Sequence, residues 1–193
     1  KQPQIVVQEC GAGLVRIRRQ SDQDGERFAF AAPRLRRSGR ADPGVRRDVA
    51  ESLRLPESAL RGVQWVDNGP GWVAALLDDA QAVLEVRPDF ALMESRSLEI
   101  GVVGRHPDQP DGVATFEVRA FTPGLSIGED PVTGSLNAGL AQWLIGAGLA
   151  PDSYRVFQGT AIGRAGRVQV DRVDDDIWVG GDVTRVVTGT VTI

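Results

Sequence analysis

The stretch Gly128–Leu144, GEDPVTGSLNAGLAQWL, places two acidic residues, a proline and a Thr-Gly-Ser turn directly before an apolar helical pattern. Leucines recur at every fourth position of that pattern, at Leu136, Leu140 and Leu144. Few polar residues interrupt it, and a helix that is apolar on most sides is typical of a protein interior. The pattern therefore predicts a buried helix near residues 135–147.

The N-terminal end of this helix, the helix mouth, is a candidate ligand site. The first N–H groups of a buried helix lack intrahelical partners. We expect Thr133 or Ser135 to cap one of them, and the remaining N–H groups to attract an anion, which the helix dipole favours. Gly134 has no Cβ, so a ligand can approach its backbone closely. Asp130 has two readings: a helix cap, or a partner for an ammonium or hydroxyl group of a substrate whose carboxylate contacts the N–H groups.

Other loop types fit these residues poorly. A phosphate-binding P-loop needs a lysine, and none follows Gly134. The G-x-S-x-G elbow of hydrolases needs a residue between glycine and serine, whereas Gly134 and Ser135 are adjacent. A serine hydrolase that uses Ser135 would have to recruit His106 from a polar loop, so this alternative has little support.

The composition indicates a chain that can bury a hydrophobic core, and it limits the classes of partner that the chain can bind. The 193 residues are 41% hydrophobic and 25% charged, which fits one large or two small folded domains. The net charge of −4 gives no electrostatic case for nucleic-acid binding. The chain has neither an apolar segment of about 20 residues nor a signal peptide, so we expect no membrane partner and a cytoplasmic location. With one cysteine, Cys10, and one histidine, His106, we expect no internal disulfide and no metal site, and Cys10 is expected to be a buried structural thiol.

Strand patterns surround two substantial helices. Asp42 is expected to cap a helix that begins at Pro43, and Asn68-Gly69-Pro70 to form a tight turn between strands. The strands are predicted over residues 14–19, 26–31, 62–67, 71–77, 98–103, 113–121, 154–158, 167–173, 177–179 and 183–193, with short helical segments over 80–84 and 88–93. The order of these elements favours the α+β class. In the strand over 113–121, Arg119 is expected either to form a cross-strand ion pair or to reach a cleft.

The run Arg119–Ser135, RAFTPGLSIGEDPVTGS, resembles the signature of the PhzF-like proteins, relatives of the phenazine-biosynthesis isomerase. Further segments resemble this family in the same order along the chain: Val7–Val15, Asp67–Leu76, Gln158–Val170 and Val179–Val191. The resemblance spans nearly the whole chain, and EDPVTGS is its more specific motif.

The resemblance implies a diaminopimelate-epimerase-like fold. Two pseudo-symmetric α/β halves would each wrap a curved mixed sheet around a central helix, with the ligand between them. Residues 1–55 would be the remainder of the first half, and residues 56–181 the second half with its central helix near 135–147. Residues 182–193 would form a final strand that returns to the first half.

The resemblance also implies a function. The family's isomerase moves a proton on a cyclic carboxylate, trans-2,3-dihydro-3-hydroxyanthranilate, with a glutamate as acid and base and with no cofactor or metal. Carried over by motif, Asp130 is the expected catalytic residue and substrate contact, and Gly134 and Ser135 are the further substrate-binding residues. The alternative is a non-catalytic carboxylate-binding or structural fragment of the same fold.

The sequence departs from the family in its N-terminal part. The catalytic glutamate and a Gly-His motif lie there in the family, and we find neither in this sequence. We therefore expect the first half to be incomplete and Lys1 not to be the natural start. Apolar surface would then be exposed by residues of the first strands: Val15, Ile17, Phe28 and Phe30. The expected partners are a small-molecule carboxylate and either a second copy of the chain or the missing N-terminal segment.

Overall fold

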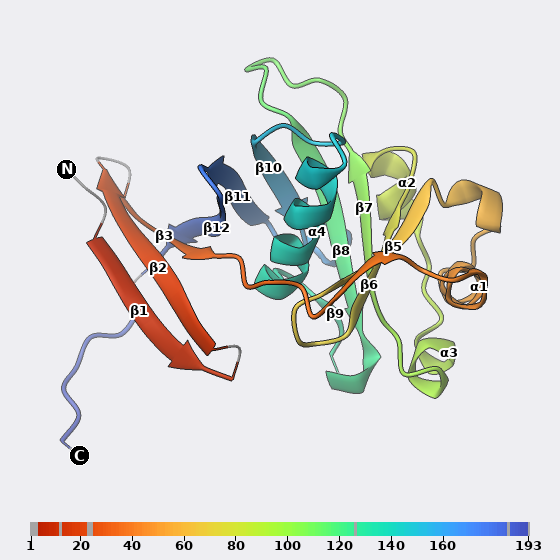
Figure 1. Ribbon diagram of the computed structural model, residues 1–193, viewed down its shortest axis with the longest axis horizontal. Helices are drawn as coiled ribbons and strands as arrows, with labels where there is room; N and C mark the ends of the chain where they lie inside the picture. The colour runs from red at the N-terminus through yellow and green to blue at the C-terminus, as the bar shows by residue number, and fades with distance from the viewer. Residues whose placement is uncertain (1–3, 12, 23–24, 126, 185, 193) are drawn as a thin grey trace.

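A mixed sheet runs through the molecule, and helix α4 (Gly134–Gly146) lies across one of its faces (Figure 1). The computed structural model describes residues 4–11, 13–22, 25–125, 127–184 and 186–192. The strand order is β1-β2-β3-β12-β11-β10-β8-β7-β6-β5-β4, and β9 pairs with β8 beside this path. The pairs β6–β7 and β8–β10 are parallel, whereas β7 and β8 are antiparallel.

The elements agree with the predicted α+β class. The strands are β1 (Gln4–Cys10), β2 (Gly13–Asp22), β3 (Gly25–Ala31), β4 (Arg37–Arg40), β5 (Gly62–Asp67), β6 (Trp72–Leu76), β7 (Glu99–Arg105), β8 (Thr115–Thr122), β9 (Gly128–Asp130), β10 (Ser153–Gln158), β11 (Gly166–Val173) and β12 (Asp176–Val183). The other helices are α1 (Pro43–Ser52), α2 (Ala80–Glu85) and α3 (Phe90–Ser95). Asp42 caps α1 as predicted, because its Oδ1 accepts hydrogen bonds from the N–H groups of Gly44 and Val45 at 3.0 Å.

The prediction that α4 is buried is confirmed. Its leucines pack in one core with side chains of the surrounding strands, among them Val66, Trp72, Phe116, Val118, Tyr154, Val156 and Val170. Glycines permit this close packing. A Cβ on Gly139 would overlap the carbonyl oxygen of Val66 on β5, and a Cβ on Gly101 of β7 would overlap the side chain of Leu136. Backbone contact therefore sets the position of α4 on the sheet.

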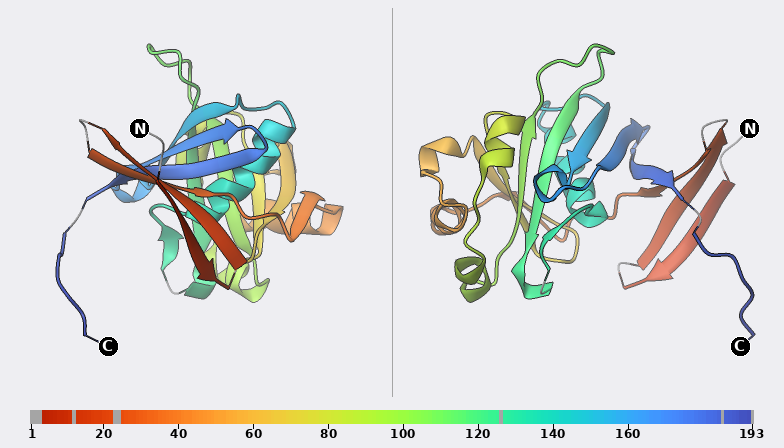
Figure 2. Two further views of the ribbon diagram at one scale, coloured as in Figure 1. Left: turned by 60° about the vertical axis from the view of Figure 1, so that its left-hand side comes forward. Right: turned by 180° about the vertical axis from the view of Figure 1, so that it is seen from behind.

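A second core lies on the other face of β5 to β8, where α1, α2 and α3 cover the sheet (Figures 1 and 2). Strand β8 passes between the two cores with the predicted alternation. Phe116 and Val118 belong to the core around α4, and Phe121 belongs to the second core.

Two short strands were not predicted, and the predicted end of the sheet is wrong. β4 and β9 contain four and three residues, too few for a periodic pattern. In place of strands over 177–179 and 183–193, a single strand β12 ends at Val183, and residues 184 and 186–192 lie outside any strand. The neighbouring strand β3 explains this end, because Val183 already faces Glu26 near the first residue of β3. The final strand expected over 182–193 therefore has no continuing partner.

The division expected at residues 55 and 56 stays a prediction, as do the pseudo-symmetric halves. In the structure β4 pairs with β5, so elements from both sides of that division share one ladder. Val49 and Leu53, in α1 and at its C-terminal end, pack in the same core as Val73 and Val102.

The β1–β2 hairpin stands away from the body of the molecule (Figures 1 and 2). β1 is the end strand of the sheet, and the hairpin exposes a set of large apolar side chains: Ile5, Val6, Val7 and Leu14. The four residues expected to be exposed, Val15, Ile17, Phe28 and Phe30, are half-buried. Cys10 is exposed, so the expectation of a buried thiol is wrong. The sequence around Cys10 forms a strand, but no second layer covers that strand in the described part of the chain.

We predict that Gly139→Ala lowers the free energy of unfolding by about 1–3 kcal/mol, because the added methyl group collides with the β5 backbone. Gly146→Ala is the matched control, since a Cβ there has no neighbour within 4 Å. We expect the control to leave stability unchanged or to raise it by up to about 1 kcal/mol through helix propensity. Urea denaturation followed by tryptophan fluorescence measures both changes, and equal effects would contradict the backbone contact.

Candidate functional site

Asp130 ends β9 and lies one turn before α4. Its Oδ2 accepts a hydrogen bond from the hydroxyl of Thr133 at 2.7 Å. Thr133 is the N-cap residue of α4, but its side chain makes no capping hydrogen bond. The expectation that a hydroxyl of Thr133 or Ser135 caps the helix is therefore wrong, because each hydroxyl has another partner. Asp130 does not cap α4 either, since its carboxylate accepts from a hydroxyl and not from a helix N–H.

The first turn of α4 consequently keeps free donors. Within the described ranges, the N–H groups of Gly134, Ser135 and Leu136 have no hydrogen-bond acceptor. The first occupied N–H of the helix is that of Asn137, which donates to the carbonyl of Thr133 at 3.1 Å. Unpaired N–H groups at the positive end of a helix dipole form a ready site for an anion.

Ser135 adds a donor to this turn. Its Oγ accepts a hydrogen bond from the indole Nε1 of Trp72 at 2.9 Å, so its own hydrogen remains available to a ligand. Its carbonyl oxygen accepts a hydrogen bond from the Nδ2 of Asn68 at 2.8 Å. Asn68 belongs to the predicted turn between β5 and β6, which thereby holds the helix mouth from one side.

Two hollows flank the helix mouth, and Phe30 lines both. The first has a volume of about 560 Å³ and is lined by Gly11, Val15, Phe30, Pro33, Arg36, Asn68, Gly69, Pro70 and Ser135. The second, of about 530 Å³, includes Gly134, Val132 and the C-terminal part of β12. The ring of Phe30 rests on the bare backbone of Gly134, where a Cβ would lie 3.2 Å from its Cε1. Asp130 lines neither hollow.

Arg36 supplies a positive charge to the first hollow. Its Nη2 donates to the carbonyl oxygen of Gly11 at 3.4 Å, and in the described part of the chain no carboxylate pairs with it. Sequence reasoning missed this residue, because nothing in the run of arginines distinguishes Arg36 from Arg34 and Arg37, and all three are exposed. Together with the helix N–H groups and the Ser135 hydroxyl, Arg36 makes the hollow suited to a carboxylate.

Glu129 is not free to act in the site. Arg119 donates from Nε and Nη2 to the two carboxylate oxygens of Glu129 at 2.9 and 2.8 Å, and both side chains are buried. The Nη1 of Arg119 also donates to the carbonyl of Val86 at the end of α2. The ion pair therefore fastens β9 to the sheet, which confirms the ion-pair reading of Arg119.

His106 lies apart from Ser135. Its Nε2 is 3.0 Å from the Oε2 of Glu117, whose side chain points away from the α4 core. A serine–histidine pair is therefore not assembled.

Gln158 is a site residue that sequence reasoning missed. It ends β10, and its fully buried amide makes hydrogen bonds with Asp130, Thr133 and Asn137. A signal was present in the sequence. Tyr154 and Val156 alternate towards α4, so the next inward position, Gln158, is a polar residue on an apolar face.

The loop after β10 holds the turn that carries Asp130. A Cβ on Gly159 would lie 2.9 Å from the carbonyl oxygen of Pro131, and one on Gly166 would lie 3.0 Å from the same atom. The glycine-rich segment thus lets its backbone approach that of Pro131 closely.

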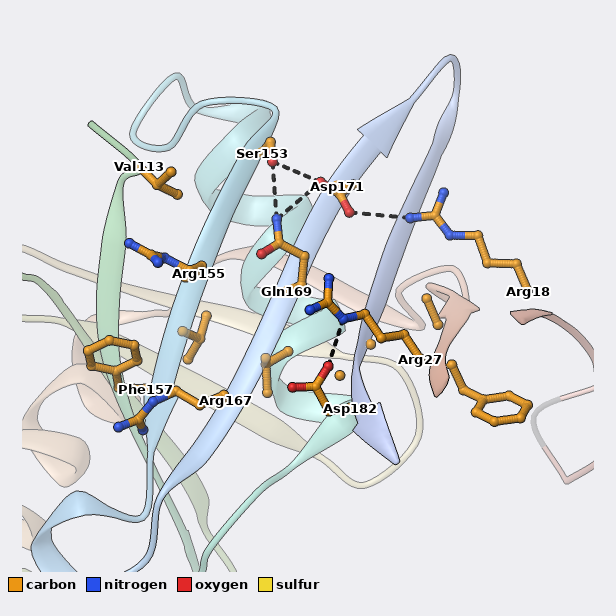
Figure 3. Close-up of a pocket in the computed structure, with 16 residues that line it drawn as sticks. Arg18, Arg27, Val113, Ser153, Arg155, Phe157, Arg167, Gln169, Asp171 and Asp182 are labelled. Atoms are coloured by element: carbon orange, nitrogen blue, oxygen red, sulfur yellow. Dashed lines mark hydrogen bonds and ion pairs between the residues drawn. The ribbon is translucent and has the colours of Figure 1, made fainter. Parts of the chain in front are cut away.

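A larger hollow of about 720 Å³ lies on the outer face of β10 to β12 and β3 (Figure 3). Its arginines are mostly neutralised: Arg18 pairs with Asp171, Arg27 with Asp182, and Arg155 with Asp111. Such cross-strand pairs are ordinary on a sheet face that meets solvent. This hollow is large, but its charges are mostly paired. The candidate functional site is therefore the N-terminal end of α4, where donors are unsatisfied.

The described residues form neither a metal-binding cluster nor a membrane-spanning helix. Among the residues that the structure describes, no three side chains of His, Cys, Asp or Glu come together as metal ligands. In the same residues, the helices are all too short or too polar to cross a bilayer.

Comparison with known proteins identifies relatives over most of the chain. The sequence model of a family described as "Phenazine biosynthesis-like protein", PhzC-PhzF, matches residues 1–189. An uncharacterised isomerase from Deinococcus radiodurans is 35% identical over 136 residues, which are 66% of this chain and 44% of that protein. Antisense-enhancing sequence 1 from Schizosaccharomyces pombe is 25% identical over 195 residues, covering 95% of this chain and 66% of its own. The uncharacterised isomerase YddE from Salmonella typhimurium is 30% identical, with coverage of 71% and 51%.

Solved structures share the fold. A protein from Pseudomonas aeruginosa described as a predicted epimerase superposes with a TM-score of 0.69 at 21% identity, covering 93% of this chain and 64% of that one. A PhzF-family protein from Enterococcus faecalis gives a TM-score of 0.67 at 19% identity, with coverage of 94% and 62%. The chain thus spans about half to two thirds of the length of the proteins it matches.

We predict that Ser135→Ala lowers the free energy of unfolding by about 1–3 kcal/mol, because the buried indole N–H of Trp72 loses its acceptor. Ser95→Ala, which removes an exposed hydroxyl on α3, is the control and should change stability by less than about 0.5 kcal/mol. Chemical denaturation measures both variants. Equal losses would mean that the Trp72–Ser135 hydrogen bond contributes nothing at the helix mouth.

Proposed function

The chain belongs to the PhzC-PhzF family of phenazine biosynthesis-like proteins, and on that premise we propose that it is a cofactor-independent isomerase or the greater part of one. The reaction moves a proton on a small cyclic carboxylate that also carries an amino or hydroxyl group, by acid/base chemistry. Several relatives are named as uncharacterised isomerases, and these names support this reaction class.

The observation that carries the proposal is the set of unsatisfied donors at the mouth of α4. The free N–H and the available hydroxyl hydrogen of Ser135 lie at one hollow with the guanidinium of Arg36, and Gly134, whose N–H is also free, lines the neighbouring hollow. Each of these groups donates, so the ligand group that they bind is an anion, and for this family a carboxylate is the natural choice.

Asp130 would bind the opposite kind of group, a hydrogen-bond donor of the substrate. Its Oδ2 is occupied by Thr133, while its Oδ1 has no partner among the described residues and is not buried. We assign Oδ1 to the amino or hydroxyl group of the substrate. A carboxylate bound at α4 and a donor bound at Asp130 would fix the ring between them, which is the orientation that proton transfer needs.

We also propose that this chain supplies one wall of a cleft in a fold of two pseudo-symmetric halves, the first half being incomplete. The resemblance assigns the acid/base glutamate to a segment outside these residues. The unpaired edge of β1 and the exposed apolar side chains of the hairpin support a partner there, either that segment or a second copy.

We predict that Arg36→Ala weakens the binding of anthranilate about tenfold or more, because a charge-assisted hydrogen bond to the carboxylate is lost. Arg34→Ala is the matched control, since Arg34 is exposed and lines neither hollow at α4. Isothermal titration calorimetry of the 193-residue chain measures both affinities. Equal affinities of the two variants would remove Arg36 from the site.

A second prediction separates catalysis from binding. When trans-2,3-dihydro-3-hydroxyanthranilate is incubated in D₂O with this chain joined to the segment that carries the acid/base glutamate, an isomerase incorporates deuterium into carbon positions that NMR resolves, and Asp130→Asn lowers the rate. Binding without label would instead support the alternative, a non-catalytic carboxylate-binding protein with the same fold.

A further inference from the structure

Asp130 belongs to a hydrogen-bond network that involves three other polar side chains, in which only the Oδ1 of Asn137 lacks a partner among the described residues. Thr133, Asn137 and Gln158 expose only 6%, 1% and 0% of their surface. Polar side chains are rarely buried to this extent unless their hydrogen bonds are satisfied. This network lies directly behind the carboxylate that the proposed function assigns to the substrate.

The orientation of the Gln158 amide is fixed by the backbone. Its Nε2 donates to the carbonyl oxygen of Asp130 at 2.9 Å, and its Oε1 accepts from the N–H of Thr133 at 3.1 Å. A carbonyl only accepts and an N–H only donates, so a reversed amide would face two like groups. Asn137 agrees with this orientation, because its Nδ2 donates to the same Oε1 at 2.8 Å.

The Gln158 amide in turn fixes the direction in which the Thr133 hydroxyl hydrogen points. The second hydrogen of Gln158 Nε2 points to Thr133 Oγ1 at 2.8 Å, so this oxygen acts as an acceptor towards Gln158. The single hydrogen of the hydroxyl is then directed to Asp130 Oδ2 at 2.7 Å. The chain of donors therefore has one direction, from Gln158 through Thr133 to Asp130.

We propose that Gln158, acting through Thr133, is a positioning residue that fixes the direction in which Asp130 presents its free Oδ1 to a donor group beside the carboxylate of the ligand. This inference rests on the proposed function, and it deepens it by naming the two residues that orient Asp130. Asp130 receives a hydrogen at Oδ2 and presents Oδ1 as a second acceptor. An aliphatic or acidic group at that position would leave Oδ1 unpaired or repelled.

Thr133 allows this inference to be tested without removing a helix cap. Its side chain makes no capping bond to α4, so Thr133→Val removes only the hydroxyl and its two hydrogen bonds. Thr133→Ser keeps the hydroxyl and is the conservative variant. Gln158→Leu removes the amide, and where it does not fold, the two Thr133 variants carry the test.

The experiment compares two acids that differ in a single group. Anthranilate carries an amino group beside its carboxylate, and 2-methylbenzoate has a methyl group of similar size in its place. Calorimetry on the wild-type chain should give anthranilate about tenfold tighter binding, as expected for a hydrogen bond to a charged group. The ratio should fall close to one in Thr133→Val and Gln158→Leu, and should return in Thr133→Ser.

The variant Arg36→Ala distinguishes the inference from its premise. It should weaken both acids equally and leave their ratio unchanged, because it acts on the carboxylate alone. If the wild-type chain binds neither acid, the proposed function is overturned and the inference with it. If it binds both, but Thr133→Val keeps the wild-type ratio, only the role of Gln158 and Thr133 is overturned. A loss of thermal stability with an unchanged ratio would likewise mean a purely structural role.

Discussion

The contact between the backbone of α4 and the backbone of β5 is the constraint on which the structure depends. Since there is no room for a side chain at Gly139, the helix sits directly on the sheet and is covered on nearly all sides. A helix buried in this way cannot satisfy its first N–H groups with bulk water. The close packing that stabilises the core therefore also creates the unsatisfied donors from which the candidate site is built.

The interior next to those donors is polar but uncharged. Two amides and a hydroxyl support Asp130, and a buried ion pair nearby, Arg119–Glu129, fastens β9 from the other side. Neutral groups lose less hydration on burial than ions do, and their geometry is fixed when every hydrogen has a defined acceptor. The turn from Asp130 to Thr133 is thus held rigid by groups that add no competing charge to the site.

The sequence predicted the features whose causes are local. Helical spacing of leucines was enough for α4, a side-chain oxygen before Pro43 for the cap of α1, and a turn tripeptide for the β5–β6 connection. Features that depend on a distant partner could not be predicted. The valine-rich end of the chain has strand propensity, yet β3 offers no further residues to pair with. Cys10 was expected to be buried because free cysteines usually are, and the sequence does not reveal that no second layer covers its strand in the described part of the chain.

The same limit applies within the site. Asp130, Gly134 and Ser135 stand in one motif and were candidates from the outset, whereas Arg36 and Gln158 approach them only in three dimensions. The structure brings Gly134 and Ser135 to neighbouring hollows and leaves Asp130 beside them, not in their lining. A single sequence does not show which distant residues come into contact. An exception is a polar residue on an apolar face, such as Gln158, which indicates that a buried polar partner exists.

The pairing of β3 with β12 has a consequence for how the chain acquires its structure. Phe30, near the beginning of the sequence, faces Val179, near its end. During synthesis β3 can pair early with β2, but it waits for β12 until all the elements between them have left the ribosome, and the side of β3 that pairs with β12 stays open until then. Strand pairing at such long sequence separation slows folding and prolongs the exposure of apolar surface. The wall of the site that Phe30 provides is thus one of the last parts of the protein to form.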